Sequence, residues 1–439
     1  MRLTIFGPSC ASSMRAAVSL LLRSSRAAGL LGAFFSLLGC AAQEKREVRH
    51  EVAPIYSASS PAFRQAAGSL LGATFVNGNS IVTLVNGREI FPAMLSAIRA
   101  AQHSIDFETY IYWDGEIARK FTDALAERAR AGVKVNAILD AQGTGKMGSE
   151  NLAKLHAAGV QVVKYHPLAW WDPRRYNNRS HRKLLVIDGR IGFVGGVGIA
   201  DEWLGDGDTP KQWRDNHYRV TGPVVAQLQG SFMDNWLKTA GTVLQGPEYF
   251  PPLAATGSYS AQAFKSSPRQ GNSDIRLMYL LAIASAQRTL LIENAYFLPD
   301  DLMLKELISA AKRGAKVSII VPGKYIDKQV LRAASRKHWP ELLKAGIRIY
   351  EYEPAMNHVK LMVVDGTFVS IGSGNFDLRS LRLNDEANFD VLSGSFASEQ
   401  ARLFERDKKR SREITLDEAG KLGFVNPATA AASLVSPEL

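Results

Sequence analysis

Two short motifs combine residue types that can carry out chemistry at phosphorus. The first reads HRKLLVID over residues 181–188, and the second reads HVKLMVVD over residues 358–365. Side chains at positions i and i+2 of a strand point to the same face, so each motif presents an imidazole beside an ammonium group. The aspartate that ends each motif precedes a glycine at a strand exit and is expected to hydrogen-bond locally. The six motif residues are His181, Lys183, Asp188, His358, Lys360 and Asp365.

Two such pairs around one tetrahedral anion would suit a double displacement at phosphorus. One imidazole would attack the phosphorus atom, while the other would protonate the leaving alkoxide and then deprotonate the incoming alcohol or water. The spacing leaves open which histidine is the nucleophile. The lysines would stabilise the phosphoryl oxygens, together with Ser373 and Asn375 in the small-residue stretch after the second motif. Because the cations are side chains, the scheme needs no metal and no other cofactor.

The elements that must position these motifs form a duplicated unit. Each copy contains a strand with an acidic and aromatic exit, an amphipathic helix, and an apolar strand that begins with Gly-x-Lys-Val. A repeat of about 180 residues indicates a domain duplication rather than a solenoid. The matching segments are 104–112 with 289–297, 117–131 with 302–313, 132–139 with 314–321, and 155–163 with 342–350.

The predicted fold class is α/β, with two duplicated α-β-α sandwich domains related by a pseudo-twofold axis. Short apolar strands that alternate with helices predict a mixed, largely buried sheet in each domain. The active site is expected at the interface, where the two motifs face each other. The predicted parts of the chain are a signal- or lipobox-like segment (1–40), a tether (41–65), a first domain (66–245), a linker (246–273), a second domain (274–412) and a tail (413–439).

Composition excludes several classes of protein. Of the 439 residues, 46% are hydrophobic and 22% are charged, which is typical of a globular chain rather than a disordered one. The only cysteines, Cys10 and Cys40, exclude a disulfide framework and a thiolate metal cluster. The net charge of +11 favours anionic partners. Four arginines and no acidic residue lie within residues 1–40, so the remainder carries +7 (11 − 4), which does not single out nucleic acid.

The N-terminal residues indicate a targeting segment. Basic residues up to Arg26 precede an apolar run over residues 27–39, which is shorter than the ~20 residues of a membrane span and fits a signal peptide. The sequence LLGC over residues 37–40 resembles a bacterial lipobox. We therefore expect a membrane-associated protein of the bacterial cell envelope, anchored as a lipoprotein at Cys40. An ordinary signal peptide and an uncleaved anchor are the alternatives, and translation could start at Met14.

The sequence resembles the phospholipase D superfamily, and within it the bacterial cardiolipin synthases. The resemblance covers about residues 75–410 and implies two phospholipase D-like domains. It also implies a phosphohistidine intermediate and an anionic phospholipid substrate, phosphatidylglycerol. A phosphatidyl group would pass to a second phosphatidylglycerol, and glycerol would be released. The segments that carry the resemblance are 180–196, 201–203, 342–365 and 372–380.

The resemblance further implies that each catalytic histidine is oriented by a carboxylate downstream of its own motif. The matching positions are Asp215 after the first motif and Glu386 after the second. A carboxylate on the imidazole fixes its tautomer and stabilises the imidazolium. In relatives the nucleophile is more often the first histidine, which favours His181 as nucleophile and His358 as acid and base. Gly198 replaces an asparagine that the family usually has, whereas the second copy keeps Asn375.

Other residues have two interpretations each. Glu108 and Glu293 occupy equivalent strand exits, where they could brace the two halves or hydrogen-bond within the site. The aromatic and basic stretch 170–176 could enter a lipid interface or pack on the surface. His217 lies near Asp215 and is expected to be a surface or core residue.

Three rival functions remain. A phospholipase D would transfer the phosphatidyl group to water and give phosphatidate, a nuclease of the superfamily would cleave DNA without a metal, and a degenerate scaffold would only bind membranes. The two intact His-Lys pairs argue against the scaffold. Their presence in one chain, together with the lipobox-like segment, favours a lipid substrate and a membrane surface over nucleic acid. The sequence leaves the oligomeric state open.

Overall fold

The computed structural model describes residues 52–168 and 177–422. They belong to a compact unit that spans Val52–Leu439. The predicted signal segment with Cys40, the first part of the tether, the whole 170–176 stretch and the end of the tail lie outside the described residues. Within the described ranges, no helix has both the length and the apolar character that crossing a membrane would require.

Strands from both copies of the repeat build a single mixed sheet. The first copy supplies β1 (Val76–Val85), β2 (Ser104–Thr109), β3 (Lys134–Asp140), β4 (Gln161–Tyr165), β5 (Leu184–Ile187), β6 (Ile191–Gly195) and β8 (Asn216–Thr221). The second supplies β9 (Tyr259–Ser266), β10 (Thr289–Asn294), β11 (Lys316–Pro322), β12 (Arg348–Tyr352), β14 (Lys360–Val364), β15 (Phe368–Gly372), β16 (Glu386–Leu392) and β17 (Ser411–Glu413). Over the described residues the 15-stranded order is β17-β12-β11-β10-β14-β15-β16-β9-β1-β8-β6-β5-β2-β3-β4.

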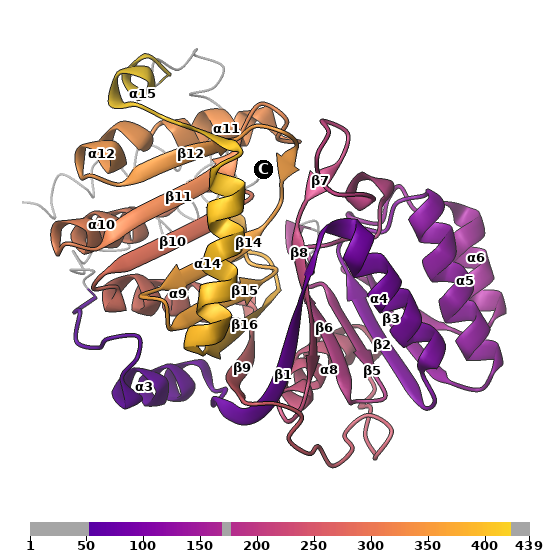
Figure 1. The fold of residues 1–439 in the computed structure, drawn as a ribbon. Helices are drawn as coiled ribbons and strands as arrows, with labels where there is room; N and C mark the ends of the chain where they lie inside the picture. The colour runs from indigo at the N-terminus through magenta and orange to yellow at the C-terminus, as the bar shows by residue number, and fades with distance from the viewer. Residues whose placement is uncertain (1–51, 169–176, 423–439) are drawn as a thin grey trace, which may run out of the picture. The chain divides into compact units, whose positions relative to one another are not determined.

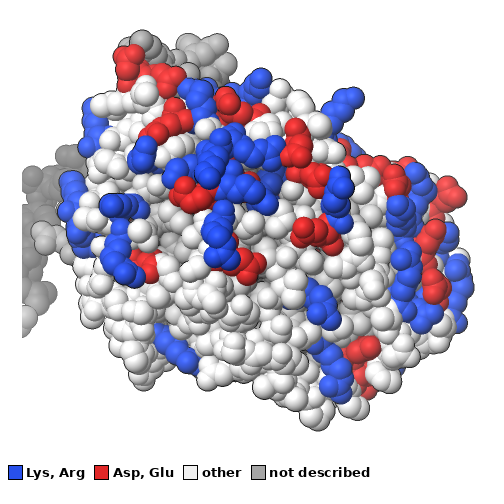
Figure 2. Space-filling model, in the orientation of Figure 1, with Lys and Arg blue, Asp and Glu red and all other residues white. Residues whose placement is uncertain are grey.

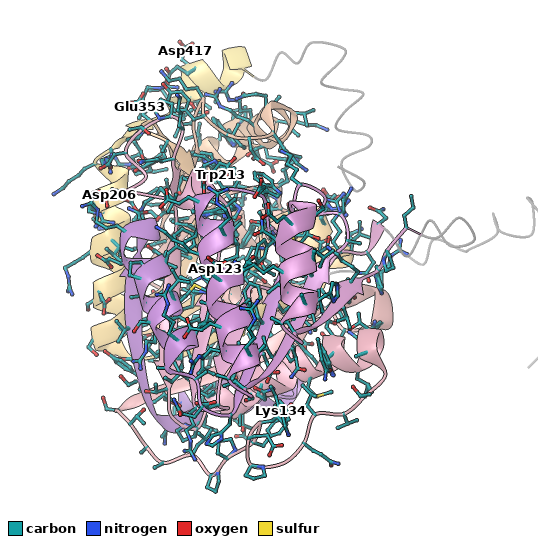
Figure 3. The ribbon with its side chains drawn as sticks, turned by 90° about the vertical axis from the view of Figure 1, so that its right-hand side faces the viewer. Asp123, Lys134, Asp206, Trp213, Glu353 and Asp417 are labelled. Atoms are coloured by element: carbon teal, nitrogen blue, oxygen red, sulfur yellow. The ribbon has the colours of Figure 1, made fainter. Side chains whose placement is uncertain are left out.

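The strand order confirms the duplication. In the first half β2, β3 and β4 are parallel, and β5 pairs antiparallel with β2. In the second half β10, β11 and β12 are parallel, and β14 pairs antiparallel with β10. The halves meet where β9 pairs with β1. In Figure 3, Lys134 at the start of β3 lies at the lower end of the molecule and Trp213 lies toward the upper end, so the exits of the parallel strands point upward.

Helices cover both faces of the sheet (Figure 1). In the first half, α4, α5 and α6 lie on one face and α8 on the other. In the second half, α9, α10 and α12 lie on one face and α14 on the other. The helices of the first half are α4 (Asn86–Ala100), α5 (Glu116–Arg130), α6 (Ser149–Ala157) and α8 (Val225–Ala240). The second half has α9 (Asp274–Ser285), α10 (Asp301–Lys312), α11 (Gln329–Arg336), α12 (Trp339–Lys344), α13 (Leu378–Arg382), α14 (Gly394–Lys408) and α15 (Leu416–Leu422), and α3 (Pro61–Leu71) packs against it.

One hydrophobic core is shared by the two halves. It contains Phe232 and Trp236 of α8 and Phe396 and Phe404 of α14, together with inward-facing residues of strands from both halves. These four aromatic side chains are at most 1% exposed. Burying a large apolar side chain stabilises a fold by about 1.5–3 kcal/mol. The interface that carries the site is therefore a packed core rather than a loose contact.

Segments expected to be connectors contain regular structure. The predicted linker 246–273 includes β9, which lies between β16 and β1 in the sheet. Phe63 of α3, in the predicted tether, is buried with its ring centroid 5.4 Å from that of Phe368. The predicted tail begins with β17 and α15. Because the sheet runs through these segments, the exact domain limits remain predictions.

Charge on the face shown in Figure 2 is mixed in sign. Lys and Arg gather over the C-terminal part of α14, and Asp and Glu lie among them. A shallow hollow there is lined by Arg402, Glu405, Arg406 and Lys409. Acidic residues inside the basic cluster reduce its attraction for anions, so the chemistry is better sought in the pocket between the halves.

Candidate active site

A pocket of about 230 Å³ opens at the exits of the parallel strands of both halves. His181 and Lys183 line it from the first half, and His358 and Asn375 line it from the second. Lys360 is buried directly behind His358, with its Nζ 3.0 Å from the ring Nδ1. The structure therefore brings both His-Lys pairs to one pocket at the interface, where the sequence analysis expects them.

His181 is held by residues of the second half. Its backbone N–H donates to the carbonyl oxygen of Asp385 at 2.8 Å. Its ring Nδ1 lies 2.9 Å from Oε2 and 3.0 Å from Oε1 of Glu386. The Tyr110 ring lies edge-on, with centroids 5.1 Å apart. His181 is 7% exposed and lines the pocket.

His358 is held by residues of the first half. Its backbone N–H donates to the carbonyl oxygen of Arg214 at 2.7 Å, and its ring Nδ1 lies 2.8 Å from Oδ2 of Asp215. The same carboxylate oxygen accepts from the indole N–H of Trp203 at 3.1 Å. The Trp213 ring packs on the imidazole, with centroids 5.1 Å apart.

Each histidine is oriented by a carboxylate from the opposite half. The expectation that a histidine pairs with the carboxylate downstream of its own motif is therefore wrong. Asp215 lies downstream of His181 but binds His358, and Glu386 lies downstream of His358 but binds His181. The reason is the pairing of backbone across the interface. Ser180 forms a bridge with Asp385, while β7 (Trp213–Arg214) pairs with β13 (Met356–Asn357) just before His358. Each half therefore completes the histidine site of the other.

The surroundings of both imidazoles favour the neutral form. Burial lowers the pKa of His181 well below its usual value, and Lys183 and Lys360 lower it further. Burial and the Lys360 ammonium lower the pKa of His358 to about 4, even though Asp215 opposes this shift. A neutral ring whose Nδ1–H donates to a carboxylate keeps a lone pair on Nε2. An anion bound in the pocket would raise both pKa values.

The two orienting carboxylates have different electrostatics. Burial raises the pKa of Glu386 to about 7, against the lowering effects of Lys183 and of two serine hydroxyls. Burial acts in the same direction on Asp215, but the opposing effects of His358 and Lys360 and of the Trp203 N–H are larger in total and hold its pKa below the ordinary value. At neutral pH Asp215 is therefore ionised, whereas Glu386 is close to half-protonated.

The two lysines are fixed by their own motifs. Lys183 Nζ donates to the carbonyl oxygen of His181 at 2.8 Å, and Lys360 Nζ donates to that of His358 at 2.6 Å. Burial lowers the pKa of Lys183 to about 7 and that of Lys360 to about 8. Because burial disfavours the charged form of both ammonium groups, an incoming phosphodiester would stabilise that form.

Asp188 and Asp365 do not line the pocket, and they hydrogen-bond locally as the motif predicts. Each sits at positive φ (52°) before a glycine at positive φ, in the tight turn of the β5–β6 or β14–β15 hairpin. The Asp188 carboxylate accepts from three successive backbone N–H groups at the start of β2. Asp365 accepts in the same way from residues 287–289 before β10. They tie each motif hairpin to the neighbouring strand and are positioning residues.

Glu108 and Glu293 support the residue before each histidine. Glu108 accepts from the hydroxyl of Ser180 and from the side-chain amide of Asn235 at 2.7 Å. Glu293 accepts from the side-chain amide of Asn357 at 2.6 Å. Both carboxylates are fully buried and do not line the pocket. The bracing interpretation of the two glutamates therefore matches their contacts.

The small-residue stretches after the motifs differ between the halves. Asn375 lines the pocket, and its side-chain Oδ1 has no hydrogen-bond partner among the described residues. The Ser373 hydroxyl donates to Glu386 instead of facing the pocket, which makes Ser373 a positioning residue and corrects its expected role at the phosphate. At Gly198 a Cβ would lie 2.8 Å from the Cβ of Ile111, so the first half has no room for a counterpart of Asn375.

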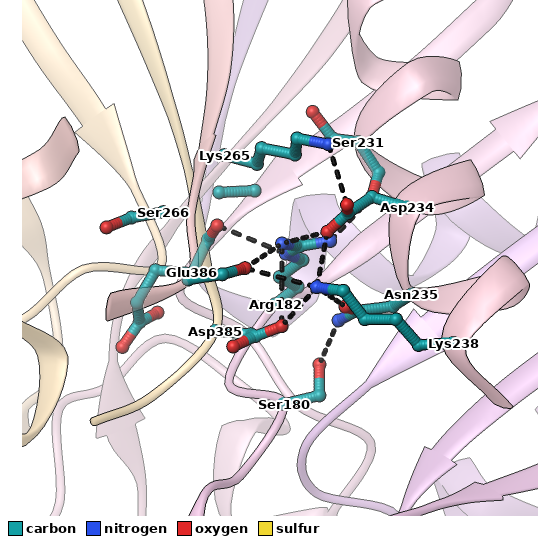
Figure 4. A network of polar contacts seen from close by, with 12 residues as sticks. Ser180, Arg182, Ser231, Asp234, Asn235, Lys238, Lys265, Ser266, Asp385 and Glu386 are labelled. Carbon is teal, nitrogen blue, oxygen red and sulfur yellow. Dashed lines mark hydrogen bonds and ion pairs between the residues drawn. The ribbon is translucent and has the colours of Figure 1, made fainter. Parts of the chain in front are cut away.

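A buried ionic network lies behind the first motif (Figure 4). The guanidinium of Arg182 donates to the carbonyl oxygen of Glu386 at 3.1 Å and to Asp234 of α8 at 3.0 Å. Lys238, also on α8, donates to Asp234 at 2.7 Å and to Asp385 at 3.0 Å. The network thereby fixes residues 385–386 of the second half against the first motif.

Arg214 has the corresponding place behind the second motif. Its guanidinium forms an ion pair with Asp407 of α14 at 2.6 Å and donates to the carbonyl oxygen of Asp215 at 2.7 Å. Arg182 and Arg214 are both completely buried. Removing one partner of such a pair typically destabilises a fold by about 3–5 kcal/mol, because the other charge stays buried.

Sequence reasoning missed several residues that line the pocket. Tyr110 and Tyr296 could have been found, because each follows the acidic residue of the strand exit in its copy of the repeat, although they are offset by one position. Lys146 and Lys328 also lie at equivalent places, six residues after the ends of β3 and β11 (140 to 146 and 322 to 328). Arg179, Arg379 and Trp213 have no counterpart in the repeat that would have singled them out. His217 is a buried core residue whose ring does not line the pocket.

Comparison with known proteins agrees with this geometry. The sequence profile of a family described as "Cardiolipin synthase, PLD-like domain" matches residues 94–206 and 279–408. The chain is 36% identical over 360 residues to a cardiolipin synthase of Geobacillus kaustophilus (strain HTA426), covering 81% of this chain and 72% of the relative. It is 40% identical over 308 residues to a cardiolipin synthase of Geobacillus thermodenitrificans (strain NG80-2), covering 70% of this chain and 61% of the relative.

The fold is also found among solved structures. A phosphatidylserine synthase of Haemophilus influenzae Rd KW20 superposes with a TM-score of 0.66 at 15% identity, covering 86% of this chain and 99% of that one. At this identity the likeness concerns the fold alone. The family match takes in both motifs, and the two halves share the predicted α/β architecture. The chain therefore belongs to the phospholipase D superfamily, in its cardiolipin synthase-like branch of phosphatidyltransferases.

Proposed function

We propose that this protein makes cardiolipin by transferring a phosphatidyl group from one phosphatidylglycerol to another, with release of glycerol. The observation that carries the proposal is the pocket between the halves. It holds two crosswise-oriented histidines, each with a lysine bound to its backbone carbonyl. Relatives that share 36–40% identity bear the name cardiolipin synthase, which supports cardiolipin as the product.

In the first step Nε2 of His181 attacks the phosphorus of the donor lipid. The bond from phosphorus to the glycerol oxygen breaks, and the His358 imidazolium gives its proton to that oxygen, so glycerol leaves as a neutral alcohol. The phosphatidyl group is then bonded to His181. Lys183, Lys360 and the amide of Asn375 stabilise the negative charge that develops on the phosphoryl oxygens.

In the second step the free hydroxyl of another phosphatidylglycerol attacks the phosphohistidine. His358, now neutral, accepts the hydroxyl proton, and the bond between phosphorus and His181 breaks. Cardiolipin is released with His181 neutral and His358 protonated, which is the state that starts the next cycle. Two phosphatidylglycerol molecules thus give one cardiolipin and one glycerol.

The electrostatics of the carboxylates support His181 as the nucleophile. Asp215 stays ionised and favours the protonated form of His358, which the general acid must adopt. Glu386 carries less negative charge near neutral pH because burial raises its pKa to about 7. His181 is therefore less easily protonated, and a nucleophilic imidazole must be neutral.

Product analysis tests the proposal. Purified protein is incubated with phosphatidylglycerol in non-ionic detergent micelles, and the lipids and glycerol are resolved by mass spectrometry. The proposal predicts one glycerol for each cardiolipin formed. Phosphatidate as the sole lipid product would identify a hydrolase, and cleavage of plasmid DNA without added metal would identify a nuclease.

We also propose that the protein is held at a membrane of the bacterial cell envelope by a lipid on Cys40. The support is the sequence pattern of residues 27–40, in which an apolar run precedes LLGC. Cys40→Ser should release the protein from the membrane fraction of the expressing cells while the activity in detergent micelles is kept. Membrane binding that is equal for Cys40→Ser and the wild type would contradict the anchor.

A further inference from the structure

Two arginines line the pocket without a carboxylate partner among the described residues. Arg379 of α13 is 6% exposed, and its Nη2 donates to the backbone and side-chain oxygens of Asn177 at 2.8 and 3.1 Å. Its Nε and Nη1 are buried and have no hydrogen-bond partner among the described residues. Arg179 donates through Nη1 to the Tyr110 hydroxyl at 3.2 Å, and its buried Nε also lacks a partner there. Neither guanidinium forms an ion pair within the described ranges.

The carboxylates that line the same pocket are engaged elsewhere. Asp327 accepts from the Tyr296 hydroxyl at 2.7 Å. Asp377 accepts from the backbone N–H of Ser380 at 2.8 Å and caps α13. Burial and the nearby Arg179 lower the pKa of Arg379 to about 10, against the opposing effect of Asp377. A buried, half-satisfied guanidinium is unfavourable unless an anion completes its hydrogen bonds.

These arginines are separate from the groups that the transfer step uses. His181, Lys183, His358, Lys360 and Asn375 already supply the nucleophile, the acid and the charge for one phosphoryl group. The pocket therefore contains cationic groups for a second anion. In the proposed reaction a second anion is present whenever the acceptor enters, since the acceptor lipid carries a phosphodiester of its own close to the attacking hydroxyl.

We propose that Arg179 and Arg379 form a second phosphate subsite, which holds the phosphodiester of the acceptor phosphatidylglycerol while the first phosphatidyl group is attached to His181. This inference rests on the proposed function. The subsite favours acceptors that carry a phosphate over water and free glycerol. It is thus a determinant of acceptor choice rather than part of the bond-making machinery. The guanidinium fork suits it, because arginine can donate two parallel hydrogen bonds to phosphate oxygens.

The test compares two acceptors in the same micelles. Exchange of labelled glycerol into phosphatidylglycerol needs the transfer machinery but uses an acceptor without phosphate. Cardiolipin formation needs the same machinery and an acceptor with phosphate. Arg379→Gln and Arg179→Gln should each lower cardiolipin formation about 10- to 100-fold, the range expected when a charged hydrogen bond is lost, and should leave glycerol exchange within about threefold of the wild type. Retained exchange also shows that the variants are folded.

The matched control is Arg382→Gln. Arg382 lies on the same helix, its side chain is 60% exposed, and it faces Asp300 outside the pocket. Both rates should stay at the wild-type level. Arg379→Lys keeps the charge without the fork and should restore part of the cardiolipin rate. Equal losses of both reactions in the Arg379 and Arg179 variants, or no loss in either reaction, would overturn the subsite.

Two further outcomes separate the alternatives. Inorganic phosphate should raise the KM for the acceptor lipid in the wild type if the subsite takes lipid phosphate. Activation of both reactions by phosphate would instead indicate a regulatory site for the free anion and would overturn the assignment. A wild-type protein that exchanges glycerol but makes no cardiolipin would contradict the proposed function itself, whatever the variants do.

Discussion

The surroundings of His181 and His358 are built on the same scaffold but carry different charges. Glu386, behind His181, accepts from the hydroxyls of Ser373 and Ser380. Asp215, behind His358, accepts from an indole N–H and from the backbone N–H of Asn216. In both cases a carboxylate from the opposite half orients the ring.

The difference between the two carboxylate sites follows from one position in each half. A Cβ at Gly196 would overlap the Asp215 carboxylate, so the glycine admits the short side chain directly behind His358. Ser373 replaces this glycine in the second half and donates a hydroxyl to the longer Glu386. Duplication therefore preserved the geometry of the site, while substitutions of small residues gave the two histidines different proton affinities.

The largest effect should come from the histidines. His181→Ala and His358→Ala should each lower cardiolipin formation by roughly 10³-fold or more, because each removes a group that the reaction cannot replace. A donor with a p-nitrophenol leaving group should restore the first step in His358→Ala only, since such a phenolate needs no proton. Release of p-nitrophenol in a stopped-flow burst measures this step. A burst of wild-type rate in His181→Ala would reverse the assignment of the two roles.

The next effect should separate the carboxylates. Asp215→Asn should lower the rate by roughly 10²–10³-fold, because it removes the ionised group that stabilises the His358 imidazolium. Glu386→Gln should lower it by roughly 10-fold near pH 7, where the native carboxyl is already about half-protonated. The steady-state rates of the two purified variants measure the difference. Equal losses would mean that the two dyads do not differ in the way that their burial and partners suggest.

The protonation of the two lysines should set the pH dependence of kcat/KM. Both must be protonated to bind the phosphodiester, and burial lowers their pKa values to about 7 for Lys183 and about 8 for Lys360. The value of kcat/KM should therefore fall as the pH rises through 7–8. Activity should hold at lower pH, because burial keeps the nucleophile His181 neutral there while His358 is more readily protonated. Lys183→Arg should shift this fall to higher pH more than Lys360→Arg does. A profile that rises between pH 7 and 9 would contradict the need for charged lysines.

The smallest effect concerns the missing asparagine. The clash with Ile111 indicates that Gly198→Asn lowers the free energy of unfolding by about 1–3 kcal/mol and does not raise the rate. Gly198→Ala is the control, because it introduces the same Cβ without an amide. Thermal unfolding and the cardiolipin rate measure the two effects. A higher rate in the asparagine variant alone would show that the first half lacks a donor that it could use.

The sequence was sufficient to predict the parts that repeat. The motif spacing placed the two histidines in one pocket, and the duplicated pattern predicted helices at 117–131 and 302–313, where α5 (Glu116–Arg130) and α10 (Asp301–Lys312) lie. Local turn chemistry also predicted the aspartate contacts, because an aspartate before glycine at a strand exit can accept from nearby backbone N–H groups.

Features that depend on contacts across the interface could not be predicted in this way. The crosswise pairing of Asp215 and Glu386 depends on which backbone segments meet, such as the bridge between Ser180 and Asp385. The inward direction of Arg379 depends on the placement of a five-residue helix, α13 (Leu378–Arg382). The residues that flank strand β9 have a composition typical of a linker, so the strand is recognised only by its pairing with β16 and β1. These contacts join residues of both copies of the repeat, so the pattern within one copy cannot predict them.

Trapping of the covalent intermediate tests the central claim most directly. The protein is quenched in the steady state with phosphatidylglycerol labelled in its phosphate, and the labelled peptide is identified by mass spectrometry under conditions that preserve phosphohistidine. The account predicts label on His181 in the wild type, more of it in His358→Ala with the p-nitrophenyl donor, and none in His181→Ala. Label on His358, or turnover to cardiolipin without label on either histidine, would contradict it.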